Sequence, residues 1–144
     1  MEKEFIPYGL SVKLKELGFD EPCFGSYYNY SEENFKEGEL GYDYRGELNI
    51  GYSEYYYGIK YYILAPTWQQ AFRFFRENYN TCVEIHETTD WEEDNESWSF
   101  VIFKYRLGDN DGMISSIIDY GTYEEAELDC LKKLIEIVEN EKTL

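Results

Sequence analysis

The chain has few of the residues on which enzyme active sites depend. His86 is its only histidine, and its three cysteines, Cys23, Cys82 and Cys130, lie far apart. A zinc site needs ligands at short spacings such as C-x-x-C or H-x-x-x-H, which the sequence lacks. It also lacks a G-x-G-x-x-G motif, a phosphate-binding P-loop and a G-x-S-x-G nucleophile motif. The sequence therefore predicts no catalytic residue, no cofactor and no metal site, and we expect a protein that is not an enzyme.

Long apolar runs are missing as well. No stretch of about 18 residues is apolar enough for a membrane helix. The first residues, Met1–Phe5, lack the basic-then-apolar pattern of a secretory signal. An odd number of widely spaced cysteines favours reduced thiols over a disulfide framework. We therefore expect a cytoplasmic protein that does not interact with membranes.

Basic residues are scarce, at 13 Lys and Arg against 30 Asp and Glu, which gives a net charge of −17. The imbalance lies mainly in residues 77–144, which carry 18 acids and 5 bases, whereas residues 1–76 carry 12 and 8. A field of this sign repels phosphate groups, so direct binding to nucleic acids is disfavoured. Two interpretations stay open: the acids keep the protein soluble, or they face a basic partner.

Aromatic residues, in contrast, are abundant, at 19% of 144 residues. The clearest pattern covers residues 67–79, where Trp68, Phe72, Phe75 and Tyr79 recur every three or four positions and so form one stripe on a helix. Thr67 and Gln70 have the spacing of a capping box at its start. We expect Trp68, Phe72 and Phe75 to be mostly buried.

Other elements follow from hydrophobic periodicity and turn residues. Helices are predicted over 11–17, ending at Gly18, and over 122–139, with a capping box formed by Thr122 and Glu125 and with Leu134 and Val138 buried. Strands are predicted over 23–28, 60–64, 81–87 and 97–105, followed by a turn at 108–112 and a hairpin partner over 113–119. Residues 29–58 predict a hairpin or irregular strand pair, with Leu48 and Ile50 facing inward.

This order of elements predicts an α+β fold. Strands joined by hairpins, with helices between them, favour an antiparallel sheet packed on one face by helices. The sequence has no repeat of fixed period and no linker, so residues 1–144 are expected to form a single domain.

Three blocks of the sequence are familiar as a set: residues 4–24, 69–77 and 122–135. Together they resemble a group of small, acidic, uncharacterised proteins encoded by phages and mobile elements of gut bacteria. The blocks cover roughly half of the chain and leave out residues 29–58 and 87–118. The resemblance implies a setting in the cytoplasm of a bacterial host, and it implies no activity or site residue.

Possible reactive groups are weak candidates. Cys82 and His86 share a strand face, but four strand residues separate them by about 13 Å, which favours core thiols and a surface imidazole over a nucleophilic pair. The acidic loop Asp90–Glu96 contains oxygen ligands for Ca²⁺ or Mg²⁺ but lacks the order and glycine of an EF-hand. Asp109–Gly112 is better explained as a hairpin turn.

Tyrosines are concentrated in one segment, since eleven of sixteen lie between Tyr27 and Tyr62. Tyrosine suits contact surfaces because it buries a large area at a low entropy cost and keeps a hydroxyl for hydrogen bonding. We therefore expect a non-enzymatic accessory protein that binds a macromolecular partner, a protein, through a tyrosine-rich and acidic surface. The residues predicted to bind the partner are Tyr52, Tyr55, Tyr56, Tyr57, Glu92, Glu93 and Asp94.

Two alternatives stay open. In the first, the carboxylates of 84–96 and 109–129 imitate DNA phosphates and inhibit a host DNA-binding or defence protein. In the second, an aromatic pocket binds a small molecule; if that molecule were a nucleotide, Lys60, Arg73 and Arg76 would have to neutralise its phosphates.

Overall fold

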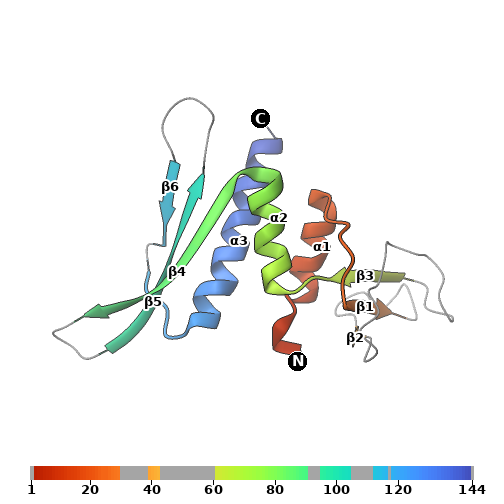
Figure 1. Cartoon of the computed structure of the whole chain (residues 1–144), viewed down its shortest axis with the longest axis horizontal. Coiled ribbons are helices and arrows are strands. Elements are labelled where there is room, and N and C mark those ends of the chain that lie inside the picture. Colours follow the sequence, from red (N-terminus) through yellow and green to blue (C-terminus); the bar gives the residue numbers. More distant parts are fainter. Residues whose placement is uncertain are drawn as a thin grey trace. The chain divides into compact units, whose positions relative to one another are not determined.

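The computed structural model of the chain describes residues 2–29, 39–42, 61–90, 95–104, 112–116 and 118–143. The chain divides into two compact units, Met1–Ala71 and Phe72–Leu144. Each unit contains one three-stranded antiparallel sheet, and the described helices α1, α2 and α3 are labelled in Figure 1. The predicted α+β class is therefore confirmed. The single-domain prediction for residues 1–144 stays a prediction.

The number of sheets differs from the expectation, since the described strands form two small sheets where one was expected. Alternation of apolar residues identifies a strand, but it does not say which strand edges pair. In this chain the strand before α2 pairs back with the first strand, and the strands after α2 pair with one another.

The N-terminal unit begins with a short 3₁₀ helix, Glu2–Glu4, followed by α1, Tyr8–Leu17. Its sheet has the order β2-β1-β3, with β1 spanning Gly25–Asn29, β2 spanning Glu39–Tyr42 and β3 spanning Tyr61–Ala65. Helix α1 starts three residues before the predicted boundary and packs against β3. It ends where predicted, because Gly18 adopts the left-handed conformation (φ 102°) that closes a helix C-terminus.

The core of this unit joins the sheet to the segments on either side of α1. The buried Tyr27 hydroxyl donates a hydrogen bond of 2.6 Å to the Ile6 carbonyl oxygen. Gly25 allows the Phe5 ring to approach β1, because a Cβ at Gly25 would lie only 2.7 Å from that ring. Among the described residues of the unit, the buried hydrophobic ones are Phe5, Ile6, Leu14, Leu17, Phe19, Cys23, Tyr27, Ile63, Leu64, Ala65 and Ala71.

Helix α2, Trp68–Tyr79, begins with the predicted capping box. The Gln70 amide donates to Thr67 Oγ1 at 3.3 Å, and the Thr67 amide donates to Gln70 Oε1 at 3.1 Å. Two N–H groups that have no partner within the helix are thereby satisfied.

The buried face of α2 is rotated relative to the predicted stripe and overlaps it only in part. Phe75 is fully buried as expected, but the other core positions are Ala71 and Phe74, while Trp68 and Phe72 are only partly buried. Trp68 lies at an edge because its indole N–H donates to the Lys3 carbonyl oxygen at 3.0 Å. A tryptophan with a polar partner of this kind stays near the surface rather than in the centre of a core.

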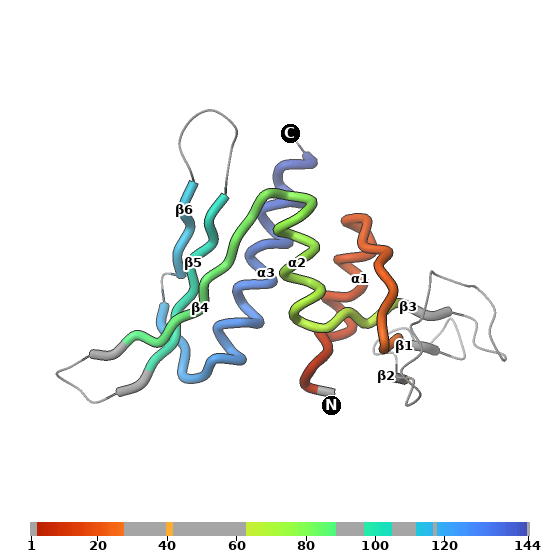
Figure 2. The backbone as a smooth tube through the Cα atoms, viewed as in Figure 1, coloured from red at the N-terminus to blue at the C-terminus, as the bar shows by residue number. Residues whose placement is uncertain are grey.

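The C-terminal unit continues from α2 into β4, Thr81–Asp90, which pairs along its length with β5, Asn95–Lys104. Strand β6, Gly112–Ser115, pairs with the other edge of β5, so the predicted hairpin partner is confirmed, although the strand ends at Ser115 and not at residue 119. Figure 2 shows the tube leaving the end of α2 and running beside β5 as β4. Directly opposite residues share a sheet face, so Val83 and Ile102 lie together, as do Ile85 and Phe100.

Helix α3, Tyr123–Lys142, packs on β4 and β5. Thr122 Oγ1 accepts a hydrogen bond from the Glu125 amide at 3.2 Å, as the predicted cap requires. The Glu125 carboxylate accepts a hydrogen bond from the Gly121 amide, whereas a capping box would use the amide of Thr122. Leu134 and Val138 are buried as predicted, whereas Tyr123 at the start of the helix is exposed. The helix buries Ala126, Cys130, Leu131, Leu134, Ile135 and Val138.

Several predictions lie outside the described residues, among them Leu48 and Ile50 and the turn at 108–112. Within the described ranges, none of the helices is long and apolar enough to cross a membrane.

Candidate functional site

The seven residues predicted to bind a partner lie outside the part of the chain that the structure describes. This applies to Tyr52, Tyr55, Tyr56 and Tyr57 and to Glu92, Glu93 and Asp94, so their role stays a prediction. The acidic loop considered for a divalent cation is described only at its two ends. Among the described residues, no group of three or more His, Cys, Asp or Glu side chains could hold a metal ion.

The cysteines are free thiols, with Cys23 and Cys130 buried and Cys82 partly buried. Burial raises the pKa of the Cys23 thiol to about 12, and the Glu21 carboxylate adds to the rise. Burial likewise raises the pKa of the Cys130 thiol to about 12, with a smaller contribution from Glu127. Since a thiolate is the reactive form of cysteine, both thiols are unreactive at neutral pH.

His86 is less exposed than the predicted surface imidazole. Its side chain is partly buried on β4, and Nε2 lies 2.9 Å from the Ser99 hydroxyl on the neighbouring strand. The other ring nitrogen, Nδ1, is buried and has no hydrogen-bond partner among the described residues. A Ser-His-acid triad needs a carboxylate at that nitrogen, so the described groups amount to a cross-strand contact.

A set of aromatic and acidic side chains meets where β5 approaches the start of α3. The Trp98 amide donates to the Tyr120 carbonyl oxygen at 2.8 Å, and the Tyr120 amide donates back at 2.7 Å. This bridge holds the segment before α3 against β5. We refer to the side chains gathered there as the aromatic–acidic patch, which comprises Trp98, Asp119, Tyr120, Tyr123, Glu124 and Glu127.

The aromatic part of this patch is ordered by ring contacts. The Trp98 and Tyr123 rings meet edge to face, with centroids 5.3 Å apart and planes at 90°. Tyr120 stacks on Phe100, which is part of the buried sheet face. Tyr123 is 39% exposed and the adjacent Ile118 is 60% exposed, so ring and apolar surface face the solvent here. Such surface suits contact with a partner.

Three carboxylates belong to the patch, and one of them, Glu127, contacts a ring residue directly. The Tyr123 hydroxyl donates to Glu127 Oε1 at 3.4 Å, and the Thr88 hydroxyl donates to Asp119 Oδ1 at 3.5 Å. Burial raises the pKa of Tyr123, and the Glu127 carboxylate raises it further, so the hydroxyl remains a neutral donor. Glu124 lies in the first turn of α3, where a carboxylate also stabilises the helix through its dipole.

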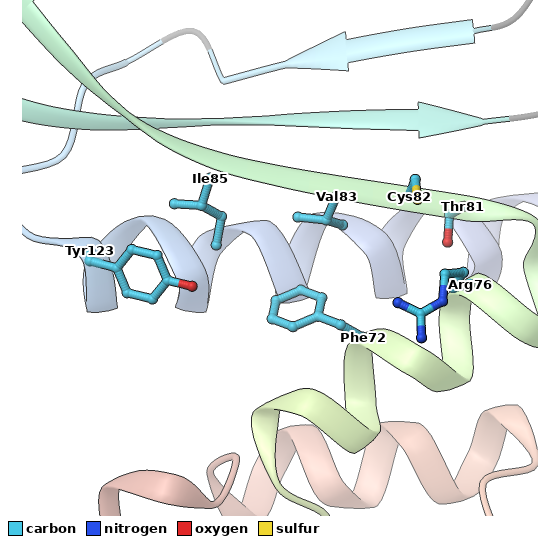
Figure 3. Close-up of a pocket in the computed structure, with 7 residues that line it drawn as sticks. All are labelled: Phe72, Arg76, Thr81, Cys82, Val83, Ile85 and Tyr123. Carbon is cyan, nitrogen blue, oxygen red and sulfur yellow. The ribbon is translucent and has the colours of Figure 1, made fainter.

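A pocket of about 170 Å³ in the C-terminal unit shares Tyr123 with this patch, and its lining residues come from α2, β4 and the start of α3. We refer to it as the α2–β4 pocket. Figure 3 shows Val83 and Ile85 pointing from β4 toward Phe72 of α2, with the Tyr123 ring at one end. The lining residues are Phe72, Arg76, Thr81, Cys82, Val83, Ile85 and Tyr123.

The opposite end of this pocket is polar. In Figure 3 the Thr81 hydroxyl points from β4 toward the Arg76 guanidinium on α2. Thr81 is only 2% exposed, and its Oγ1 has no hydrogen-bond partner among the described residues. Arg76 is exposed and lies in the last turn of α2, where a cation also interacts favourably with the helix dipole.

Sequence reasoning missed both sites because their residues are distant in the chain. Trp98 and Tyr123 are joined by the bridge between β5 and residue 120, and no spacing pattern predicts that bridge. The one available signal was the predicted capping box at Thr122, which fixes where α3 begins and therefore where Tyr123 stands. Comparison with known proteins adds no further assignment, since no family model, curated protein or solved structure matches the chain.

Proposed function

We propose that the protein is a non-enzymatic binding protein whose aromatic–acidic patch holds a basic segment of a protein partner. The observation that carries this proposal is the edge-to-face contact of the partly buried Trp98 with the exposed Tyr123, beside the Glu127 carboxylate. The proposal keeps the tyrosine-rich and acidic chemistry predicted from the sequence and assigns it to described residues of the C-terminal unit.

The chemistry of the patch favours a lysine or arginine side chain. A cation near an aromatic ring is attracted by the negative face of the ring, and a nearby carboxylate adds a direct ion pair. Between Glu77 and Leu131 the sequence has only two basic residues, Lys104 and Arg106, against fifteen acids. Lys104 already pairs with Glu141. A partner that supplies cations would therefore neutralise a local excess of negative charge.

The setting of this binding is proposed from the sequence resemblance alone. Three blocks of the chain resemble small acidic proteins of phages and mobile elements of gut bacteria. On that basis we propose an accessory protein that acts in the bacterial host cytoplasm on a host or phage protein with an exposed basic segment.

Imitation of DNA is the alternative use of the same acids. It requires carboxylates that remain unpaired along one face. On α3, however, Asp129 lies 3.1 Å from the Lys132 ammonium, and Glu136 lies 2.9 Å from that of Lys133. These pairs reduce the negative charge of the helix beyond its first turns, which favours a local basic contact over an extended phosphate-like array.

The proposal is tested with a fluorescently labelled peptide rich in lysine and arginine, whose anisotropy is followed as protein is added. Binding is expected to weaken as salt increases. The double variant Glu124→Gln/Glu127→Gln should weaken it by about fivefold, as the loss of two partly exposed charge contacts implies. Tyr123→Leu should weaken binding as well, because it removes the ring and keeps an apolar side chain.

The matched control is the double variant Glu77→Gln/Glu136→Gln, which changes the net charge equally but lies outside the patch. Binding by this control should equal that of the parent protein at every salt concentration. Equal weakening by the two double variants would mean that the peptide responds to net charge alone, and the proposed site would be wrong.

A further inference from the structure

We infer that the α2–β4 pocket is a binding site for a small carboxylic acid with an aromatic or branched aliphatic body. The pocket shares Tyr123 with the aromatic–acidic patch, but its polar end differs in chemistry, since it is formed by Arg76 and Thr81 rather than by carboxylates. Its ligand is a free small molecule, because a volume of about 170 Å³ admits a single ring and one polar group.

The polar end has the groups that a carboxylate requires. Arg76 is the only charged residue among the described residues that line the pocket, and a guanidinium forms strong, often paired hydrogen bonds with a carboxylate. The Thr81 hydroxyl, buried without a partner among the described residues, can donate a second hydrogen bond. A buried hydroxyl without a partner is costly, so a ligand oxygen at this position would remove a cost that the fold otherwise bears.

The remainder of the lining suits an apolar body. Val83 and Ile85 form one wall from β4, Phe72 faces them from α2, and the Tyr123 ring closes the end remote from Arg76. The acid group and the apolar body would therefore occupy opposite ends of the pocket, and this arrangement sets the orientation of the ligand. A neutral ligand of the same shape would not supply the negative charge that a guanidinium pairs with.

The test uses sodium benzoate and sodium 3-methylbutanoate as probes, with benzamide as the neutral control, and follows amide signals of ¹⁵N-labelled protein. Both acids are expected to shift the amide signals of Thr81, Val83 and Ile85, and the shifts should saturate. The dissociation constant should be on the order of 1 mM, because ligands with so few atoms bind weakly. Benzamide should bind at least about tenfold more weakly than benzoate.

Variants separate recognition from general effects. Arg76→Gln should weaken benzoate binding by about tenfold, while Arg73→Gln, one turn earlier on α2 and outside the lining, should leave it unchanged. Thr81→Val keeps the side-chain shape and removes the hydroxyl that has no partner among the described residues, so its melting temperature should be at or above that of the parent. Its affinity for benzoate should be about threefold lower. No saturable shift with either acid, equal affinity for benzamide, or equal effects of the two arginine variants would overturn the inference.

Discussion

At the scale of single residues, Phe75 and Phe72 make a pair that tests how α2 contributes to stability. Phe75 is fully buried and contacts the Phe74 ring, whereas Phe72 is only partly buried beside the α2–β4 pocket. We expect Phe75→Ala to lower the free energy of unfolding by about 3–5 kcal/mol and Phe72→Ala to lower it by clearly less. Urea denaturation of both variants measures the difference. Equal losses would mean that Phe72 and Phe75 contribute equally to the core, as the predicted stripe implies, and would contradict the observed burial.

The buried thiols are expected to make the folded protein less stable as the pH becomes alkaline. The pKa of the Cys130 thiol is raised from 9.0 in an unperturbed chain to about 12 in the folded protein. The folded state therefore holds a proton that the unfolded state loses, and the resulting stabilisation is complete below about pH 9 and disappears as the pH rises toward 12. The free energy of unfolding should fall by up to about 1.4 kcal/mol per pH unit in this interval for this group.

The measurement compares urea midpoints of the parent protein and of Cys130→Ala as the pH is raised from neutrality. The variant starts from a lower stability because it loses buried volume, but its stability should fall less steeply with pH. Cys23→Ala should behave in the same direction, since the pKa of Cys23 is also raised to about 12. Parallel pH dependences for parent and variants would contradict the burial assigned to these thiols.

At the scale of elements, the start of α3 positions the aromatic–acidic patch. Thr122 Oγ1 accepts from the Glu125 amide, so Thr122→Ala should cost about 1 kcal/mol of stability. Thermal or urea unfolding measures this loss. Thr143→Ala at the exposed C-terminal end of α3 is the control and should change stability by less than about 0.5 kcal/mol. A Thr122 variant as stable as this control would show that the cap does not hold the helix start.

Local signals explain why the elements could be predicted. Both capping sequences and the glycine at position 18 act within a few residues, and each marks a helix boundary close to the observed one. The burial of Trp68 and Phe72 was less predictable, because helical spacing defines a stripe but the surrounding contacts decide which side of it faces the core. The separation of the strands into two sheets depends on pairing between distant segments, which periodicity does not encode.

At the scale of the whole molecule, the charge distribution was visible in the sequence and its geometry was not. The excess of acids in residues 77–144 is a matter of counting. The position of Glu127 beside Tyr123, and of that ring beside Trp98, follows from the packing of α3 on β4 and β5. The polar end of the α2–β4 pocket likewise combines Arg76 from a helix with Thr81 from a strand. Residue types were therefore predictable, whereas the sites that they form were not.

The central claim, that the aromatic–acidic patch receives a basic segment, is tested most directly by mapping where such a segment binds. The ¹⁵N-labelled full chain is titrated with an unlabelled lysine- and arginine-rich peptide at constant salt, and every assigned amide and indole signal is followed. The account predicts that the largest shifts occur at Trp98, including its indole N–H, at Tyr120 and at Tyr123. Shifts concentrated at residues 52–57 or 92–94, or spread evenly over the acidic residues, would contradict it.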